Sequence, residues 1–160
     1  MKTIALVTLF LLPLFPLPQT AHAAGIEVRN AWARAPAPGQ STAGIYMDIV
    51  SADGAALVGV KSVLAKRAEL HSTSMQDGVM RMRAVERIEL PAKRKVSLAP
   101  GGQHVMLIDM VRALREGEKL PLELILEDTG GARSTLRVDA TVRAAGHRSP
   151  RSWSRHTPNR

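Results

Sequence analysis

The chain has 160 residues, of which 45% are hydrophobic and 22% charged, and it contains no cysteine. This length suits one domain, and the composition excludes both a low-complexity disordered chain and a multi-span membrane protein. The absence of thiols excludes disulfide scaffolds, thiolate zinc sites, iron–sulfur clusters, cysteine nucleophiles and lipid attachment through an N-terminal cysteine. Any metal ligands must therefore be His, Met or carboxylate side chains.

The first segment has the features of an export signal. Lys2 precedes an apolar run from Ile4 to Leu17, and a small-x-small pattern follows at residues 21–23. We predict a signal peptide over residues 1–23, cleaved near Ala23/Ala24, and a periplasmic protein. The alternative is an uncleaved membrane anchor, but prolines interrupt a run that is already shorter than the roughly 20 residues needed to span a bilayer.

Short apolar stretches separated by turn-forming residues follow, and each is expected to be a β-strand. In chain order they span residues 26–34, 43–50, 56–64, 68–73, 79–90, 95–98, 104–110, 120–127 and 134–142. Their spacing, with no convincing long amphipathic helix, predicts an antiparallel β-sandwich or Greek-key barrel over residues 24–142. The best helical alternative is 105–114, where we expect a strand followed by a turn.

Residues 143–160 differ in character from the rest of the chain. They contain five arginines and no acidic residue, with little apolar surface to bury, so we predict a basic disordered tail. The tail could contact an anionic lipid surface or an acidic partner, or it could simply be solvated. Nucleic acid is not an expected partner, because the protein is exported and its body lacks a basic stripe interleaved with aromatic residues.

The sequence offers little support for catalysis. It has no Gly-x-Ser-x-Gly elbow, no glycine-rich phosphate loop and no His-Glu-x-x-His helix. We therefore predict no catalytic residues and a protein that is not an enzyme.

The most informative residues are two histidines and two methionines. His71 lies late in one predicted strand, Met82 follows the next turn, and His104 and Met106 follow a Pro-Gly-Gly turn. Alternation places His104 and Met106 on one side of their strand. Thioether sulfur binds Cu(I) well but zinc, calcium and magnesium poorly, and imidazole suits copper broadly. Convergence of these four neutral donors would therefore favour Cu(I).

Methionines also fill protein cores, so each one taken alone is weak evidence for a metal site. We assign the other methionines of the domain to packing: Met47, Met75, Met80 and Met110. Met75 and Met80 lie close enough in sequence to be spare donors. Met80 also shares a strand face with Met82 by alternation.

The spacing His71-x10-Met82-x21-His104-x-Met106 resembles that of the periplasmic copper chaperones of the PCuAC type. The similarity extends over about residues 26–142 and includes the segments 30–35, 43–47, 78–82, 100–107 and 114–118. The resemblance implies a cupredoxin-like β-sandwich. It also implies that one Cu(I) per chain binds near the surface through His71, Met82, His104 and Met106.

The resemblance further implies delivery of copper to the dinuclear copper site of cytochrome c oxidase, alongside a membrane-anchored thiol chaperone. The sequence leaves two alternatives open: copper storage or detoxification, and an exported adhesion or assembly module with an incidental His/Met cluster. A weak second copper site at His147 and His156 is a further possibility. These two residues are nine positions apart without other donors between them, so a solvated tail is the alternative.

Overall fold

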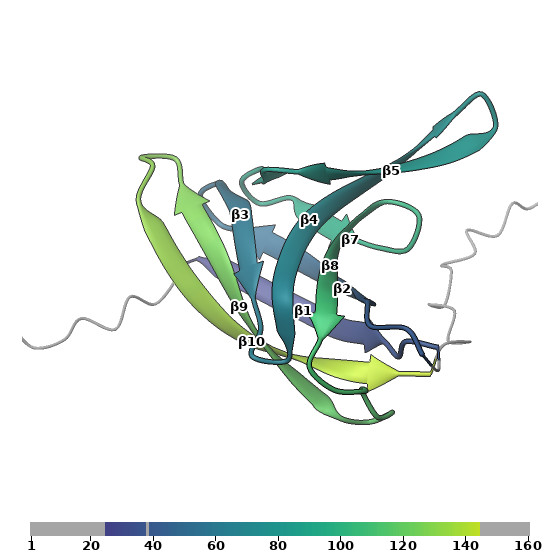
Figure 1. Cartoon of the computed structure of the whole chain (residues 1–160). Coiled ribbons are helices and arrows are strands. Elements are labelled where there is room, and N and C mark those ends of the chain that lie inside the picture. The colour runs from purple at the N-terminus through teal and green to yellow at the C-terminus, as the bar shows by residue number, and fades with distance from the viewer. Residues whose placement is uncertain (1–24, 38, 145–160) are drawn as a thin grey trace, which may run out of the picture.

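The computed structural model describes residues 25–37 and 39–144, which form ten β-strands (Figure 1). The strands are β1 (Ile26–Arg34), β2 (Ala43–Ser51), β3 (Ala55–Lys61), β4 (Ala65–Gln76), β5 (Val79–Val85), β6 (Ile88–Leu90), β7 (Lys95–Leu98), β8 (Gln103–Met110), β9 (Lys119–Asp128) and β10 (Arg133–Arg143). The predicted all-β class is confirmed. The stretch 105–114 is strand as far as Met110 and then bends, as expected.

One predicted strand was wrong. The stretch 79–90 is two strands, because β5 pairs with β4 whereas β6 pairs with β3. Glu86 and Arg87 carry the chain from one pairing to the other. Alternation along the sequence does not reveal such a change of pairing partner, because side chains point to alternate faces in β5 and in β6 alike.

The strands form one continuous sheet in the order β5-β4-β8-β2-β1-β10-β9-β3-β6, with β7 also paired to β2. The sheet folds over so that its two halves face each other across a common core, which makes a β-sandwich (Figure 1). Leucines at alternate positions of β9, from Leu120 to Leu126, pack in this core with Ile45, Val105 and Leu107. Burial of their apolar surface is the main stabilising term of the domain.

The prediction of an antiparallel arrangement holds for most of the sheet, with one exception. β1 and β10 run parallel, with Trp32 opposite Thr141 and Ala33 opposite Val142. These are the first and last strands, so no short hairpin joins them and a parallel pairing is possible. β10 also extends one residue beyond the prediction, to Arg143, whose guanidinium carbon lies 5.1 Å from the Trp32 ring centroid.

The faces of each strand follow from alternation, and this places the candidate ligands outside the core. In β8, Val105 and Leu107 point into the core, so His104 and Met106 face outward. In β1, a bulge between Arg29 and Trp32 resets the register, and Trp32 is turned to the outer face while Ala33 packs inside.

The β4–β5 hairpin extends beyond the body of the sandwich, at the upper right of Figure 1. Its turn is Asp77-Gly78, and both residues have positive φ, 50° and 76°. Two such residues define a type I′ turn, whose twist matches that of a two-stranded ribbon. This turn pairs Gln76 with Val79 and so fixes the register of every later pair.

The part of the chain that the structure describes contains no helix long and apolar enough to cross a membrane. The predicted signal peptide and its cleavage point lie outside the described residues, as do His147 and His156 and nearly all of the predicted tail.

Candidate metal centre

The candidate ligands lie on the outer face of the β5-β4-β8-β2 half of the sheet. His71 on β4 and His104 on β8 are directly opposite each other. Met82 on β5 is opposite Thr73, two residues along β4 from His71 and therefore on the same face. Met106 shares this face with His104 by alternation. The four predicted residues thus occupy one face of three neighbouring strands.

A row of aromatic rings crosses this face. The centroids of Trp32 and Tyr46 are 4.5 Å apart, those of Tyr46 and His104 are 6.1 Å apart, and those of His104 and His71 are 5.7 Å apart. Each of the strands β1, β2, β8 and β4 contributes one ring to this row. Burial raises the pKa of the Tyr46 phenol above its usual value, although the nearby Arg34 opposes this shift. The phenol is therefore neutral at physiological pH.

His104 is held rigidly, with only 3% of its surface exposed. Its Nδ1 is 3.0 Å from the carbonyl oxygen of Gly102, which also accepts the backbone N–H of Thr73. Because a carbonyl only accepts, Nδ1 carries the proton, and Nε2 is the nitrogen with a free lone pair. A hydrogen bond that fixes one nitrogen in this way is the usual support of a metal-binding histidine.

His71 has the opposite arrangement, because its Nε2 lies 2.9 Å from Glu69 Oε2. If Nε2–H donates to this carboxylate, Nδ1 keeps the free lone pair. The His71 side chain is only 15% exposed, so this Nδ1 is buried. Among the described residues it has no hydrogen-bond partner. Leaving a buried polar atom unsatisfied is costly, so a partner such as a metal ion fits here.

The two proposed thioethers line a pocket of about 300 Å³ together with His104. Met82 is 53% exposed, so its sulfur is accessible from solvent. The rest of the wall comes from the end of β1, the β1–β2 connection, β2, one residue each of β4 and β5, and the Pro100-Gly101 turn. His71 is not among the lining residues and adjoins the pocket through its contact with His104. The structure therefore brings three of the four predicted residues to one pocket and the fourth directly beside it.

A glycine is required where β2 borders this pocket. Gly44 is opposite Met106, and the Tyr46 ring folds over it. A Cβ at Gly44 would lie 2.6 Å from the Tyr46 hydroxyl oxygen and 3.0 Å from its Cζ. Atoms this close would clash, so only glycine lets the tyrosine keep its place in the row of rings.

Sequence reasoning missed several residues of this pocket. Thr73 and Tyr46 line it but carry no sequence signal for a metal site. Met80 lines it too; its assignment to packing was wrong, because it is 61% exposed, and the sequence had named it only as a spare donor. Glu69 stands two residues before His71, and this spacing on one strand face could have identified it as the partner of that histidine.

The chemistry of the donors limits which metals fit. Within the described residues, no three side chains of the types His, Cys, Asp and Glu come together in a metal-binding group. A metal held on this face would therefore have to use the methionines along with the histidines. Such a neutral donor set of nitrogen and thioether sulfur suits Cu(I) and suits hard divalent cations poorly.

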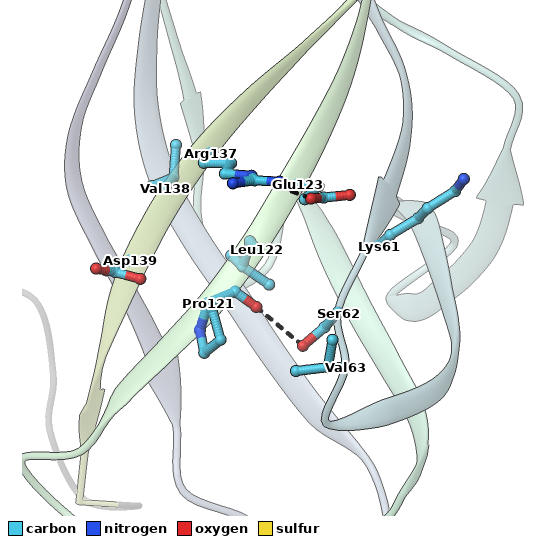
Figure 2. Close-up of a pocket in the computed structure, with 9 residues that line it drawn as sticks. All are labelled: Lys61, Ser62, Val63, Pro121, Leu122, Glu123, Arg137, Val138 and Asp139. Atoms are coloured by element: carbon cyan, nitrogen blue, oxygen red, sulfur yellow. Dashed lines mark hydrogen bonds and ion pairs between the residues drawn. The ribbon is translucent and has the colours of Figure 1, made fainter.

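A larger hollow lies elsewhere on the molecule and has none of these donors. It has a volume of about 660 Å³ and is lined by residues of β9, β10 and the end of β3 (Figure 2). Its polar side chains are largely paired, since Arg137 contacts Glu123 at 3.2 Å and the Ser62 hydroxyl donates to the Pro121 carbonyl at 3.0 Å. Nothing in this groove resembles a metal site.

Comparison with known proteins shows the family of the chain. Residues 26–142 match the family described as "Putative lipoprotein LpqE-like". A protein of Leifsonia xyli subsp. xyli, named "Putative lipoprotein Lxx21020", is 31% identical over 118 residues, which cover 73% of this chain and 70% of that protein. The present sequence contains no cysteine that could carry a lipid.

Similar solved structures include copper-bound proteins. The copper-bound PCuAC domain from PmoF2 is 30% identical, with a TM-score of 0.61 and coverage of 75% of this chain and 93% of that domain. The Cu(I) form of DR1885 from Deinococcus radiodurans is 31% identical, with a TM-score of 0.54 and coverage of 79% and 85%. Its apo form is 29% identical, with a TM-score of 0.57 and coverage of 90% and 97%. The chain belongs to the LpqE-like family and shares the fold of PCuAC domains.

Proposed function

We propose that this protein is an exported copper chaperone that binds one Cu(I) as cargo through His71, Met82, His104 and Met106. The observation that carries the proposal is the meeting of these donors on one outer face, three of them around one pocket and the fourth with a buried, unpartnered nitrogen. Two similar solved structures of about 30% identity, the PCuAC domain from PmoF2 and DR1885, are copper-bound, which supports the same assignment.

The donor set explains the choice of oxidation state. Two imidazoles and two thioethers are uncharged, so the loaded site would carry only the single charge of Cu(I). This limits the cost of partial burial. Thioethers have no proton to lose, and in an oxidising compartment they do not form disulfides as thiols do. Sulfoxide formation remains the chemical hazard for the exposed methionine.

The geometry suits transfer better than permanent storage in a closed site. His104 is buried and hydrogen-bonded, so it provides a fixed anchor for the ion. Met82 is exposed on a hairpin strand and provides a ligand that can leave. Copper would then move by stepwise exchange, as each thioether lone pair is replaced by a donor from the acceptor. No proton or electron has to be transferred in these steps.

The wider setting is part of the same proposal. Residues 1–23 would direct export, residues 24–142 would bind copper, and residues 143–160 would be a basic tail. The lipoprotein names of the family and of the relative support a location in the cell envelope, which we take to be the periplasm. The acceptor would be a copper-binding protein, and we propose that it is the copper-bearing subunit of cytochrome c oxidase. A membrane-anchored thiol chaperone would act in the same delivery.

Two other functions make different predictions. A storage or detoxification protein would use the same ligands but would release copper slowly to an acceptor. An adhesion or assembly module would bind no stoichiometric copper. The proposal is of a binding and transfer protein and not of an enzyme.

The test is a Cu(I) titration of the purified protein against a chromophoric competitor, under anaerobic conditions. We expect one tight equivalent, which is weakened in His71→Ala and in Met106→Leu. The matched control is Met110→Leu, which makes the same change in a methionine that packs against the core. Equal affinity in wild type and Met106→Leu would refute the proposed site. Rapid transfer of the bound copper to an oxidase copper domain would then separate delivery from storage.

A further inference from the structure

Two methionines near the tip of the β4–β5 hairpin are exposed without a structural use. Met75 is 64% exposed and Met80 is 61% exposed. With Val79 and Met82 they make the hairpin the main site of exposed large apolar side chains in the described residues. Apolar side chains gathered in this way usually mark a binding surface, because they contribute nothing to the core.

The type I′ turn brings these two methionines together. Since the turn pairs Gln76 with Val79, the next pair outward from the turn is Met75 and Met80. Residues directly opposite in an antiparallel pair have Cβ atoms about 4.5–5.5 Å apart, which lets two flexible methionine side chains meet at one ion. A shift of register by one residue would move them to different faces.

The same strand face leads from this pair into the pocket. Met75 is four residues from His71 on β4, and Met80 is two residues from Met82 on β5, so all four share the outer face. Met80 itself lines the pocket with Met82, His104 and Met106. Thioether side chains on this face therefore extend from the Met75–Met80 pair to the pocket that His104 lines.

The other face of the hairpin has the opposite character. Arg81 and Arg83 alternate with the methionines of β5 and pair with Ser74 and Ser72. Their positive charges disfavour the approach of a cation from that side. A copper ion would therefore approach the hairpin on its methionine face.

We propose that Met75 and Met80 form an outer two-thioether Cu(I) site through which copper enters and leaves the four-ligand site. The inference rests on the proposed function and adds a route of exchange to it. The ion remains Cu(I) throughout, and each step replaces one thioether lone pair by another. Two exposed thioethers bind more weakly than four donors around a pocket, so the outer site would fill second.

The direct test is NMR of the methionine methyl groups, labelled with ¹³C, during addition of Cu(I) without oxygen. We expect the first equivalent to shift the methyl signals of Met82 and Met106, and the second to shift those of Met75 and Met80. The buried Met47 provides the internal reference. If two equivalents shift Met82 and Met106 but leave Met75 and Met80 unchanged, the outer site is refuted while the proposed function stands. If no methionine signal shifts, the proposed function itself fails.

A kinetic test uses Met75→Leu, a residue outside the pocket lining, with Met110→Leu as control. We expect copper transfer to a chromophoric chelator to slow by about tenfold, while the affinity for the first equivalent changes by less than about threefold, because a labile soft donor is lost from the route only. Unchanged transfer would overturn the proposal. A loss of more than about tenfold in first-equivalent affinity would also overturn it, since Met75 would then belong to the primary site.

Discussion

Two hollows of the molecule differ in what lines them, and the smaller of the two carries the function we propose. The groove beside β9 and β10 has about twice the volume of the pocket between β5, β8 and the β1–β2 connection, 660 against 300 Å³. In the groove, Arg137 and Glu123 pair with each other. Beside the pocket, a histidine nitrogen is buried without a partner in the described structure, and the Met80 and Met82 side chains of the pocket are exposed. Unsatisfied donors identify a binding site better than volume does.

The difference has its origin in what faces outward from each half of the sheet. Outward positions on β9 and β10 include two oppositely charged pairs in register, Arg133 with Glu127 at 3.0 Å and Arg137 with Glu123 at 3.2 Å. Outward positions on β4, β5 and β8 include two imidazoles and several thioethers, and a thioether sulfur is only a weak hydrogen-bond acceptor. These side chains are therefore available to bind a soft metal ion, whereas the charged pairs of β9 and β10 already bind each other.

Removal of the Met82 and Met106 thioethers should have the largest effect on copper affinity. Met82→Leu/Met106→Leu keeps the size and apolarity of the side chains but removes two soft donors. We expect Cu(I) affinity to fall by at least about 100-fold, equivalent to about 2.7 kcal/mol. The measurement is the anaerobic competition titration. Val63→Thr, in the groove, should leave copper affinity as in wild type, and equal losses in the two variants would remove the distinction between the hollows.

A clash at the edge of the pocket should have the next largest effect. Gly44→Ala would place a Cβ 2.6 Å from the Tyr46 hydroxyl oxygen, and the buried ring has little room to move. We expect the free energy of unfolding to fall by about 1–3 kcal/mol, the usual cost of overpacking. Denaturant unfolding measures this.

Gly102→Ala is the matched control, because the closest atom to its Cβ, the Ala99 carbonyl oxygen, would be at an ordinary 3.6 Å. Similar destabilisation by both substitutions would show that loss of glycine, and not contact with Tyr46, is responsible.

Removal of the Glu69 carboxylate, which contacts His71, should lower copper affinity less than removal of the two pocket thioethers does. Glu69→Ala removes the acceptor of the Nε2–H bond, so the ring loses its fixed orientation. We expect Cu(I) affinity to fall by about tenfold, at the low end for partners of metal-bound histidines.

Glu69→Gln keeps an oxygen acceptor and should recover part of this loss. An affinity in Glu69→Ala equal to that of wild type would mean that His71 binds without support from Glu69.

The smallest effect concerns an ion pair outside both hollows. Arg112 and the Arg115 backbone N–H bond to Glu118 and lower its pKa from 4.5 to about 2. A lowered pKa in the folded state means that the stabilisation is present above pH 4.5 and is lost as the pH falls toward 2. Arg112→Ala should raise the pKa of Glu118 in a carboxyl ¹³C NMR titration. It should leave copper binding at neutral pH unchanged, and a changed affinity would show that the pocket is coupled to this distant pair.

Much of the fold could be predicted from local pattern. Alternation and turn residues located the strands to within a few positions, and they placed His104 and Met106 on one face because adjacent strand residues always point to opposite sides. The split of 79–90 into β5 and β6 and the parallel pairing of β1 with β10 were not predictable in this way. Both depend on which distant strand is the partner, and hydrophobic period carries no information about that.

By itself, the sequence determined the class of chemistry. With no cysteine, and with two histidines and two methionines at a spacing that resembles the PCuAC type, the sequence predicts a neutral donor set, which by ligand preference favours Cu(I). Only the tertiary structure decided that the donors lie on the outer face. It also decided that Glu69 and Gly102 direct the two imidazoles and that Met75 and Met80 extend the line of thioethers to the hairpin tip. These features depend on the pairing of strands distant in sequence, and folding fixes that pairing through the burial of the opposite face in a common core.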